Sequence, residues 1–513
     1  MTSTLKLLAI QIISAGLITA PVFAATGPLT EAKQLEAQAT KHLNAKNIDT
    51  AIPLLRRALE LLEKKLGPAH PRLASTLGNL AIVQQMKGRN AEALSLFSRA
   101  LKIREKALGA EHPKVADTLN NIGGFLQSQG KQKKAAAFFR RALAIREKKL
   151  GRYHLKVGRS LKKLADIYRL QQKYSQAEPL YRRALAVFDK TLPPGHTKIT
   201  ETLEFLTLSM FPQRKFLSAE PLLKRLLALQ EKYLGKEHIV ISKTLNNLAI
   251  SLRIKGNLPV AEGLLRRSLA IVQKNLGPNN LHVAVGLNNL ADIYQIQGLL
   301  PKAELLYIAS MKMREKILGD RSPQVLFSLN NLTSLYLKQR KYDKAEPILK
   351  RVLDIHTKTL GPKPPRVASS LAFLGNLYLR KGEFEKSVAH HQRALEIREK
   401  IYGSDHPEVA KSLHQLATSY IFQVDPGKFR EAADLLKRAL RIRQKKFSKN
   451  HPAIALTLES LALLYKTNER DGKRFSERAK IIRSNIKKNK KKRYLRSKRG
   501  IEIQSENLRD RCM

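Results

Sequence analysis

Apolar residues lie on two helical stripes in each of a series of similar segments along the chain. In residues 243–277 the first stripe, with Leu245, Leu248, Ala249 and Leu252, has the i, i+3, i+4, i+7 spacing of one face of an α-helix. Lys255-Gly256-Asn257 interrupts it. The second stripe contains Val260, Ala261, Leu264, Leu265, Leu269 and Ile271. Gly277 ends it, because glycine readily adopts the left-handed conformation that follows a helix. Each segment is therefore expected to form two antiparallel helices joined by a tight turn.

The segment recurs every 42 residues. The closing glycine falls at Gly67, Gly109, Gly151, Gly235, Gly277, Gly319, Gly361 and Gly403, and a proline stands at 193. A three-residue insertion near Val424–Gly427 then shifts the frame. Small residues recur at one place in each first helix, such as Ala81, Gly123 and Gly375. Large residues such as Phe97, Phe139 and Tyr181 recur in the second helix. The period predicts an all-α solenoid, and the alternation of sizes predicts close packing within each helix pair.

These segments resemble the tetratricopeptide repeat in its longer, kinesin light chain-like form. The motifs that carry the resemblance are LNNLA at 245–249 and 287–291, AEPLYRRALAV at 177–187, AEPILKRVLDI at 345–355 and LGAEHPKVA at 108–116. The resemblance implies a right-handed superhelix of about eleven antiparallel helix pairs over residues 29–485. The first pair (29–66) and the last (452–485) are degenerate, as terminal repeats usually are. It also implies that the first helices line the concave face.

The N-terminal residues 1–24 read as a signal peptide. One lysine precedes the apolar run LLAIQIISAGLITA, and Val22-Phe23-Ala24 suits cleavage after Ala24. An uncleaved N-terminal anchor is the alternative interpretation. With a single cysteine, Cys512, the chain cannot form an internal disulfide. An exported bacterial protein, periplasmic or secreted, is therefore expected.

The charge of the chain is strongly unbalanced, with 95 Lys and Arg against 42 Asp and Glu and a net charge of +53. Such a charge predicts attraction to polyanions, including nucleic acid, lipopolysaccharide and anionic lipid. Part of the excess lies in doublets such as Arg182-Arg183 on the second helices, followed by Arg-Glu-Lys triplets at Arg104, Arg146, Arg314 and Arg398. The outer face of these helices is expected to be convex.

Residues 486–513 form a basic tail. Its candidate anion-binding residues are Lys487, Lys488, Lys490, Lys491, Lys492 and Arg493. Such a block is usually a solvated tail, but it can also bind phosphates or act as a nuclear-localisation signal. The export signal at the other end of the chain weighs against the last interpretation.

Histidines recur once per repeat at the joint before the first helix, at His70, His112, His154, His196, His238, His406 and His451. Residues one repeat apart lie about 10 Å apart, so two of them cannot share a metal ion. Ser322 takes the same place in one repeat, and serine caps helices. The histidines are therefore interpreted as helix starts. No catalytic signature is present, so we expect no enzyme activity, no cofactor and no metal site.

The asparagines of the first helices are the candidate peptide-binding residues. The set comprises Asn79, Asn120, Asn121, Asn246, Asn247, Asn288, Asn289, Asn330 and Asn331, with Lys243, Arg253 and Lys338 beside them. An amide can donate to and accept from the backbone of an extended peptide. By the resemblance, such asparagines bind peptide backbone in the groove. The alternative is that they bond within their own repeat or hold the neighbouring repeat in register. The pattern is lost at Lys162-Lys163, Glu204-Phe205 and Ala372-Phe373.

Three functional hypotheses follow. The first is a non-enzymatic adaptor that binds an extended, acidic peptide segment of a partner protein in the groove, since cations exceed acids on the predicted inner face. The second is a polyanion binder that uses the convex face and the tail. The third is a secreted effector of a host-associated bacterium. The oligomeric state and the partner's identity stay open.

Overall fold

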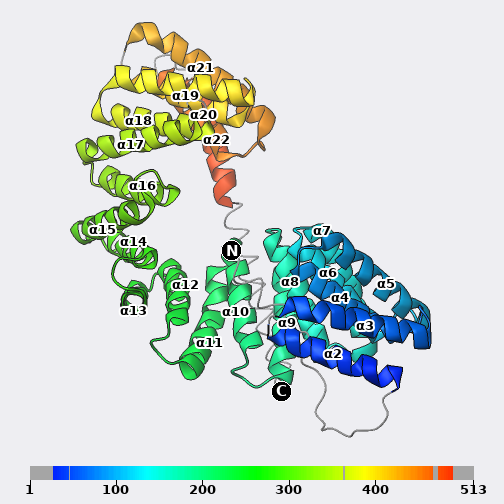
Figure 1. Cartoon of the computed structure of the whole chain (residues 1–513). Helices are drawn as coiled ribbons and strands as arrows, with labels where there is room; N and C mark the ends of the chain where they lie inside the picture. The colour runs from blue at the N-terminus through cyan, green and yellow to red at the C-terminus, as the bar shows by residue number, and fades with distance from the viewer. Residues whose placement is uncertain (1–26, 46, 362–363, 424, 466–471, 489–513) are drawn as a thin grey trace, which may run out of the picture. The chain divides into compact units, whose positions relative to one another are not determined.

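The computed structural model describes residues 27–45, 47–361, 364–423, 425–465 and 472–488. Within these ranges all regular structure is helical (Figure 1). The predicted signal peptide and most of the predicted tail lie outside the described residues. By its contacts the chain divides into two compact units, residues 1–275 and 276–513.

The described residues form eleven successive helix pairs, and the division between the units falls at the end of α13. The pairs of the first unit are α2 (Pro28–Asn44) with α3 (Ile48–Leu66), α4 (Leu73–Met86) with α5 (Asn90–Leu108), α6 (Pro113–Ser128) with α7 (Gln132–Leu150), α8 (Leu155–Leu170) with α9 (Tyr174–Thr191), α10 (Thr197–Met210) with α11 (Phe216–Leu234), and α12 (Ile239–Lys255) with α13 (Leu258–Leu276). Those of the second unit are α14 (Leu281–Ile296) with α15 (Leu300–Leu318), α16 (Pro323–Lys338) with α17 (Tyr342–Leu360), α18 (Pro365–Lys381) with α19 (Phe384–Tyr402), α20 (Pro407–Gln423) with α21 (Pro426–Lys446), and α22 (Pro452–Leu464) with a last helix, 472–488. The predicted all-α solenoid is confirmed.

Close packing within a pair depends on the small residue of the first helix. A Cβ added at Gly123 would lie 2.7 Å from the Phe139 ring, and one added at Gly375 would lie 2.5 Å from the His391 ring. Both rings are buried, at 1% exposure or less. One residue of the predicted second stripe is misplaced: Val260 is 49% exposed, because it comes one position before the buried face that begins at Ala261.

The joints between repeats use a glycine where the backbone turns out of the second helix. Gly109, which follows α5, has φ +83°, and its amide donates to the Glu105 carbonyl. This positive φ accounts for the recurrence of glycine every 42 residues. The joint then leads directly into the next first helix.

The first helices line the concave side of each unit. Those of successive repeats contact each other directly, for example α4 with α6, α8 with α10 and α18 with α20. Among the described residues, the second helices of successive repeats do not approach one another as closely. Helices on the inside of a curve must lie closer together than those outside. The expectation from the family resemblance therefore agrees with the packing.

Each first helix presents one strip of side chains that is not buried by its neighbours. In α12 this strip consists of Lys243, Asn247, Ile250 and Ile254, at the i, i+4, i+7, i+11 positions of one helix face. We call it the inner stripe, and number its four positions one to four. The equivalent residues in other first helices lie 42 residues before or after, with three more residues after the insertion. The inner stripes form the candidate binding surface.

None of the described helices is long and apolar enough to cross a membrane.

Candidate functional site

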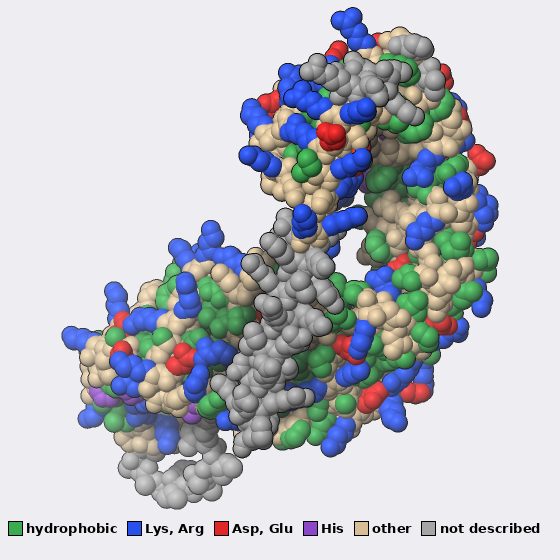
Figure 2. All heavy atoms as spheres, turned by 180° about the vertical axis from the view of Figure 1, so that it is seen from behind, with side chains coloured by type: hydrophobic (Ala, Val, Ile, Leu, Met, Phe, Trp, Pro, Cys, Tyr) green, Lys and Arg blue, Asp and Glu red, His purple; other side chains and the backbone are tan. Residues whose placement is uncertain are grey.

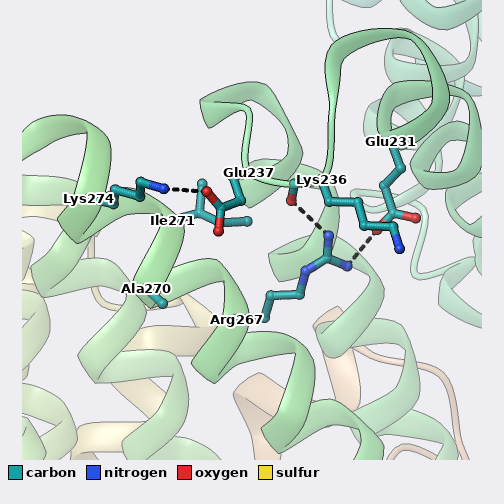
Figure 3. A pocket seen from close by; sticks show the side chains of 7 residues that line it. All are labelled: Glu231, Lys236, Glu237, Arg267, Ala270, Ile271 and Lys274. Carbon is teal, nitrogen blue, oxygen red and sulfur yellow. Dashed lines mark hydrogen bonds and ion pairs between the residues drawn. The ribbon is translucent and has the colours of Figure 1, made fainter.

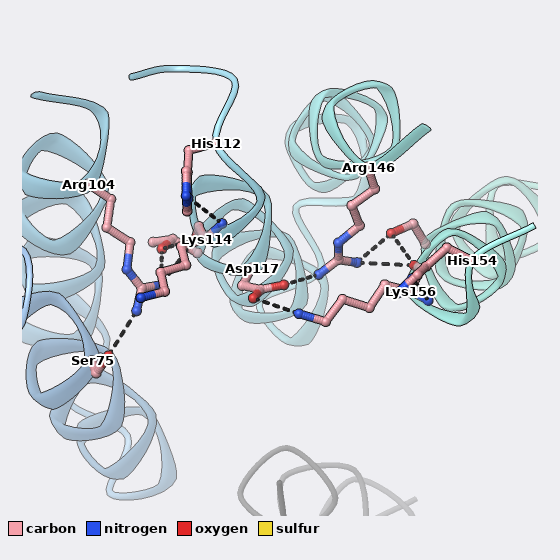
Figure 4. Close-up of polar contacts among 10 residues, drawn as sticks. Ser75, Arg104, His112, Lys114, Asp117, Arg146, His154 and Lys156 are labelled. Carbon is pink, nitrogen blue, oxygen red and sulfur yellow. Dashed lines mark hydrogen bonds and ion pairs between the residues drawn. The ribbon is translucent and has the colours of Figure 1, made fainter. Parts of the chain in front are cut away.

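The periodic histidines are helix caps, as predicted. Nδ1 of His112 accepts a hydrogen bond from the Lys114 amide at 3.1 Å, and His154 accepts one from the Lys156 amide at the same distance (Figure 4). Ser322 caps α16 through the Gln324 amide. No group of three or more His, Cys, Asp or Glu that could hold a metal ion occurs among the described residues.

A second periodic feature of the joints is a row of buried or half-buried arginine side chains on the second helices. Arg146 on α7 is 5% exposed, and its guanidinium donates to Ser160 Oγ at 2.5 Å and to Asp117 Oδ1 at 2.6 Å. Arg104 on α5 donates to Thr118 Oγ1 at 2.6 Å and to Ser75 Oγ at 3.0 Å. Figure 4 shows both guanidiniums reaching between successive first helices. Each arginine therefore ties a second helix to the next repeat.

The same row continues in the second unit. Arg314 donates to Ser328, Arg398 to Ser412 and Arg443 to Thr457, in every case to a hydroxyl 14 residues further on. Burial lowers the pKa of Arg443 to about 10. The arginines of the Arg-Glu-Lys triplets are thus not part of the convex surface, where the sequence analysis placed them. The orientation of these arginines is set by the buried apolar residues of the same helix, and not by their charge.

The basic doublets of the second helices do reach the outer side, but their second member is paired. Arg141 contacts Glu105 at 2.6 Å, Arg225 contacts Asp189 at 2.5 Å and Arg351 contacts Glu315 at 2.5 Å, each across one repeat. Figure 3 shows Arg267 held between Glu231 and the Lys236 carbonyl, in a shallow surface pocket. These acids therefore serve to connect repeats, and they offset part of the outer positive charge.

Several of the predicted asparagines have structural partners. Asn246 Nδ2 donates to Ser268 Oγ at 2.7 Å and to the Ser242 carbonyl at 3.0 Å, within its own repeat. Asn331 Nδ2 donates to Asn288 Oδ1 at 3.0 Å, which joins α16 to α14. Asn288 is 1% exposed and Asn120 is 9% exposed. For these residues the structure shows the intra-repeat and register contacts that the sequence analysis gave as the alternative to peptide binding.

The remaining asparagines lie differently. Asn79, Asn121, Asn247 and Asn289 are half-buried at position two of the inner stripe, and Asn330 is exposed. Among the described residues, no side-chain hydrogen bond is made by the amides of Asn79, Asn121, Asn247 or Asn330. The donors and acceptors of these four amides are therefore available to the backbone of a bound peptide.

The three predicted groove cations also differ from one another. Lys243 Nζ pairs with Glu204 Oε1 at 2.6 Å, across successive first helices of the first unit. Arg253 is half-buried and Lys338 is exposed, and neither has an ion pair within the described part of the chain. Of the tail residues, Lys487 and Lys488 lie in the last turn of the helix 472–488. Lys490, Lys491, Lys492 and Arg493 lie outside the described residues.

Where the asparagine pattern fails in the first unit, charged and aromatic side chains gather instead. Phe205 on α10 has the Lys162 ammonium 5.0 Å and the Arg169 guanidinium 4.6 Å from its ring centroid, both from α8. Lys162 also lies 3.3 Å from Asp166 and 3.5 Å from Glu201. Asp166 accepts in turn from the hydroxyl of the buried Tyr181. The first unit therefore has a preformed cationic surface around an aromatic ring at this place.

Three further cations belong to this surface. Arg159, Lys163 and Lys198 make no ion pair with any described residue, and we call these three with Lys162 the α8–α10 cluster. Burial, and then the charge of Arg146, lowers the pKa of Lys163 to about 8. Burial and the Arg159 charge likewise lower the pKa of Lys198. Like charges held together at low solvation favour the binding of an anion, which relieves their repulsion.

Two features of this surface were not found from the sequence. The arginine row has a signal, since an arginine with a hydroxyl residue 14 positions later recurs at the same place in five repeats. The α8–α10 cluster has no such signal within a single repeat, because its members come from two helices and from four different positions of the repeat. The sequence analysis expected more cations than acids on the inner face, but it did not bring these four residues together.

Known proteins agree with this architecture. A STAND signal-transduction ATPase with a tetratricopeptide-repeat sensor from Pyrococcus horikoshii is 15% identical, with a TM-score of 0.51, covering 89% of this chain and 71% of that one. BtubC (BKLC) from P. vanneervenii is 24% identical, with a TM-score of 0.38, covering 45% and 91%. A kinesin light chain with nearly identical TPR-like repeats from Podosopora anserina is 26% identical, with a TM-score of 0.36, covering 40% and 98%. No curated protein matches the chain.

The family comparison covers most of the solenoid. The tetratricopeptide repeat matches residues 35–106, 85–148, 114–190, 206–274, 282–358 and 366–445, which together exceed half of the 513 residues. The resemblance to the tetratricopeptide repeat that the sequence motifs carry is confirmed by this match. Such repeats form a scaffold whose extended surface is available to protein partners. The chain belongs to the tetratricopeptide-repeat family.

Proposed function

We propose that this protein is a non-enzymatic scaffold that binds an extended, acidic segment of a partner protein on its inner stripes. The observation that carries the proposal is the α8–α10 cluster, in which the charges of four cations act on one another and, among the described residues, Lys162 pairs with Asp166 and Glu201. The free amides of Asn79, Asn121 and Asn247 lie on the same inner stripes of the first unit. Acidic side chains would contact the cluster while the amides bond to the peptide backbone.

Charge alone does not distinguish this proposal from general attraction to polyanions. Figure 2 shows Lys and Arg side chains spread over the visible surface, with few acids among them. A matched pair of variants separates the two. Arg159→Ser with Lys198→Ser removes two cations from the inner stripe region. Arg140→Ser with Lys133→Ser removes two exposed cations of α7 that make no ion pair with a described residue.

The probe is a fluorescein-labelled dodecapeptide of glutamate and serine, and its anisotropy is measured with the full chain. We expect the inner pair to weaken binding at least tenfold, by about 0.7 kcal/mol or more per contact, and the outer pair to change it less than twofold. Equal losses in both variants would instead support diffuse polyanion binding. Absence of binding by the unaltered protein would contradict both.

We also propose that the protein is exported, on the basis of the sequence of residues 1–24. Cell fractionation, with N-terminal sequencing of the recovered protein, tests this. Recovery in the bacterial envelope or medium with Ala25 as the first residue is expected. A cytoplasmic protein that begins at Met1 would refute it.

A further inference from the structure

Three phenylalanines of the second unit are largely exposed on successive first helices. Phe327 on α16 is 54% exposed, Phe373 on α18 is 59% exposed and Phe422 on α20 is 53% exposed. Scattered exposed apolar residues are ordinary, but a row of large aromatic side chains on neighbouring elements marks a binding surface. We call these three residues the phenylalanine row.

The phenylalanine row crosses the inner stripes as a diagonal. Phe327 is at position one of its stripe, Phe373 at position two and Phe422 at position four, so they are displaced by four and then seven residues along the helix axis. These offsets correspond to about 6 and 10 Å. With first helices about 10 Å apart, successive rings are separated by roughly 12 to 14 Å. An extended chain covers that distance in about four residues.

Every second side chain of an extended peptide points to the same side, so residues i, i+4 and i+8 all face one surface. The diagonal therefore fits a segment in extended conformation that carries three large apolar side chains at this spacing. A helical segment would need its large apolar residues about eight positions apart to cover the same distance, at about 1.5 Å per residue.

The surroundings of the row are positively charged. The sequences of α16 and α18 contain no acidic residue, and α20 contains only Glu408, in its first turn. Exposed cations lie on both sides of the diagonal: Lys338 and Arg380 at position four of the stripes of α16 and α18, and Lys411 at position one of the stripe of α20. None of the three makes an ion pair within the described residues. This positive charge favours a peptide that carries acidic residues between its large apolar residues.

We propose that the second unit binds an extended peptide segment with large apolar residues at i, i+4 and i+8 and acidic residues between them. The apolar side chains would pack on Phe327, Phe373 and Phe422, and the acidic ones would pair with Lys338, Arg380 and Lys411. This specificity deepens the proposed function, on which it rests, and assigns a second, aromatic binding surface to the protein.

The test compares two labelled nonapeptides of leucine, glutamate and serine with equal composition. In one the leucines stand at positions 1, 5 and 9, and in the other at 1, 2 and 3. Variants of the full chain exchange each phenylalanine for the residue that another repeat carries at the same position: Phe327→Ser as at Ser369, Phe373→Asn as at Asn331 and Phe422→Ser as at Ser128. Because these residues already occupy that place in folded repeats, thermal unfolding should be unchanged.

We expect the spaced peptide to bind at least tenfold more tightly than the clustered one. Each single variant should weaken the spaced peptide roughly tenfold, as the loss of one buried apolar contact predicts, and leave the clustered peptide unchanged. The dodecapeptide of glutamate and serine should be unaffected by all three variants. That control separates the two proposals, because its binding reports the α8–α10 cluster and not the row.

Three outcomes would overturn the inference. Equal affinity for both nonapeptides would remove the spacing requirement. A lower unfolding temperature in all three variants would show that the rings stabilise the unit by packing within it. If the unaltered chain is a dimer in solution and the variant with all three substitutions is a monomer, the row contacts a second copy of the chain.

Discussion

The inner stripes of the two units contrast in their chemistry, although the same repeat builds both. In the first unit, position two holds Asn121, Lys163, Phe205 and Asn247 in succession, and the aromatic ring is covered by cations from α8. In the second unit the three rings of the phenylalanine row stay more than half exposed, although the Arg314 guanidinium lies 5.6 Å from the Phe327 ring centroid. The helix pairs beneath differ little, since their small and large residues alternate in both. The comparison teaches that the scaffold fixes where side chains are presented, while the repeat tolerates almost any side chain on the inner stripe.

The largest effect should come from charge reversal on each inner surface. Arg159→Glu with Lys198→Glu should weaken the glutamate–serine dodecapeptide more than 100-fold, since two attractions become repulsions of about 1–2 kcal/mol each. Lys338→Glu with Arg380→Glu should change its binding less than threefold. Fluorescence anisotropy at low salt measures both. If the second-unit variant were equally damaging, the two surfaces would not be distinct.

Substitution of a closely packed glycine by alanine should then test how tightly the core of each unit is packed. Gly375→Ala introduces a Cβ only 2.5 Å from the His391 ring, and Gly123→Ala one 2.7 Å from the Phe139 ring. Each should lower the free energy of unfolding by about 1–3 kcal/mol. Hydrogen exchange followed by mass spectrometry should localise the loss to the repeat concerned and its neighbours, since repeats contact only adjacent repeats. Uniform loss over the chain would show that the two units unfold together.

Acid should destabilise the second unit through its buried histidines. Burial lowers the pKa of both His391 and His414 to about 4. The unfolded chain binds these protons near pH 6.5, so stability is complete above that pH and falls towards pH 4. The expected loss at pH 5 is about 2 kcal/mol per histidine.

His391→Leu, which matches Leu349 of the preceding repeat, provides the control. The variant should lose about half of the pH dependence between pH 7 and pH 5, measured by urea denaturation. An undiminished pH dependence would mean that other groups titrate.

The smallest expected effect is a difference in stability between variants of Asn331 and Asn247, which occupy equivalent positions in two repeats. Asn331→Ala removes the donor to the buried Asn288 and should cost about 1–2 kcal/mol. Asn247→Ala removes an amide that has no partner among the described residues, and should leave the unfolding free energy unchanged while it weakens peptide binding. Thermal unfolding and anisotropy together decide this. Equal stability losses would give both residues a structural role.

The sequence was sufficient for the fold because the relevant information is local and repeated. Helix stripes, the closing glycines and the capping histidines each depend on contacts within a few residues, and eleven approximate copies reinforce the pattern. The candidate site was predicted only in part. Asn247 and Asn331 look alike in sequence, yet one amide is free and the other joins α16 to α14. Such a difference depends on the neighbouring repeat, which a pattern within one repeat does not describe.

By itself, the sequence determined that this chain is a tetratricopeptide solenoid, that its histidines start helices and that its charge is strongly positive. Only the tertiary structure decided which cations are paired, which arginines are buried and which rings stay exposed. The physical reason is that pairing and burial join residues 14 to 43 positions apart through the packing of successive helices. The α8–α10 cluster and the phenylalanine row both arise at that level.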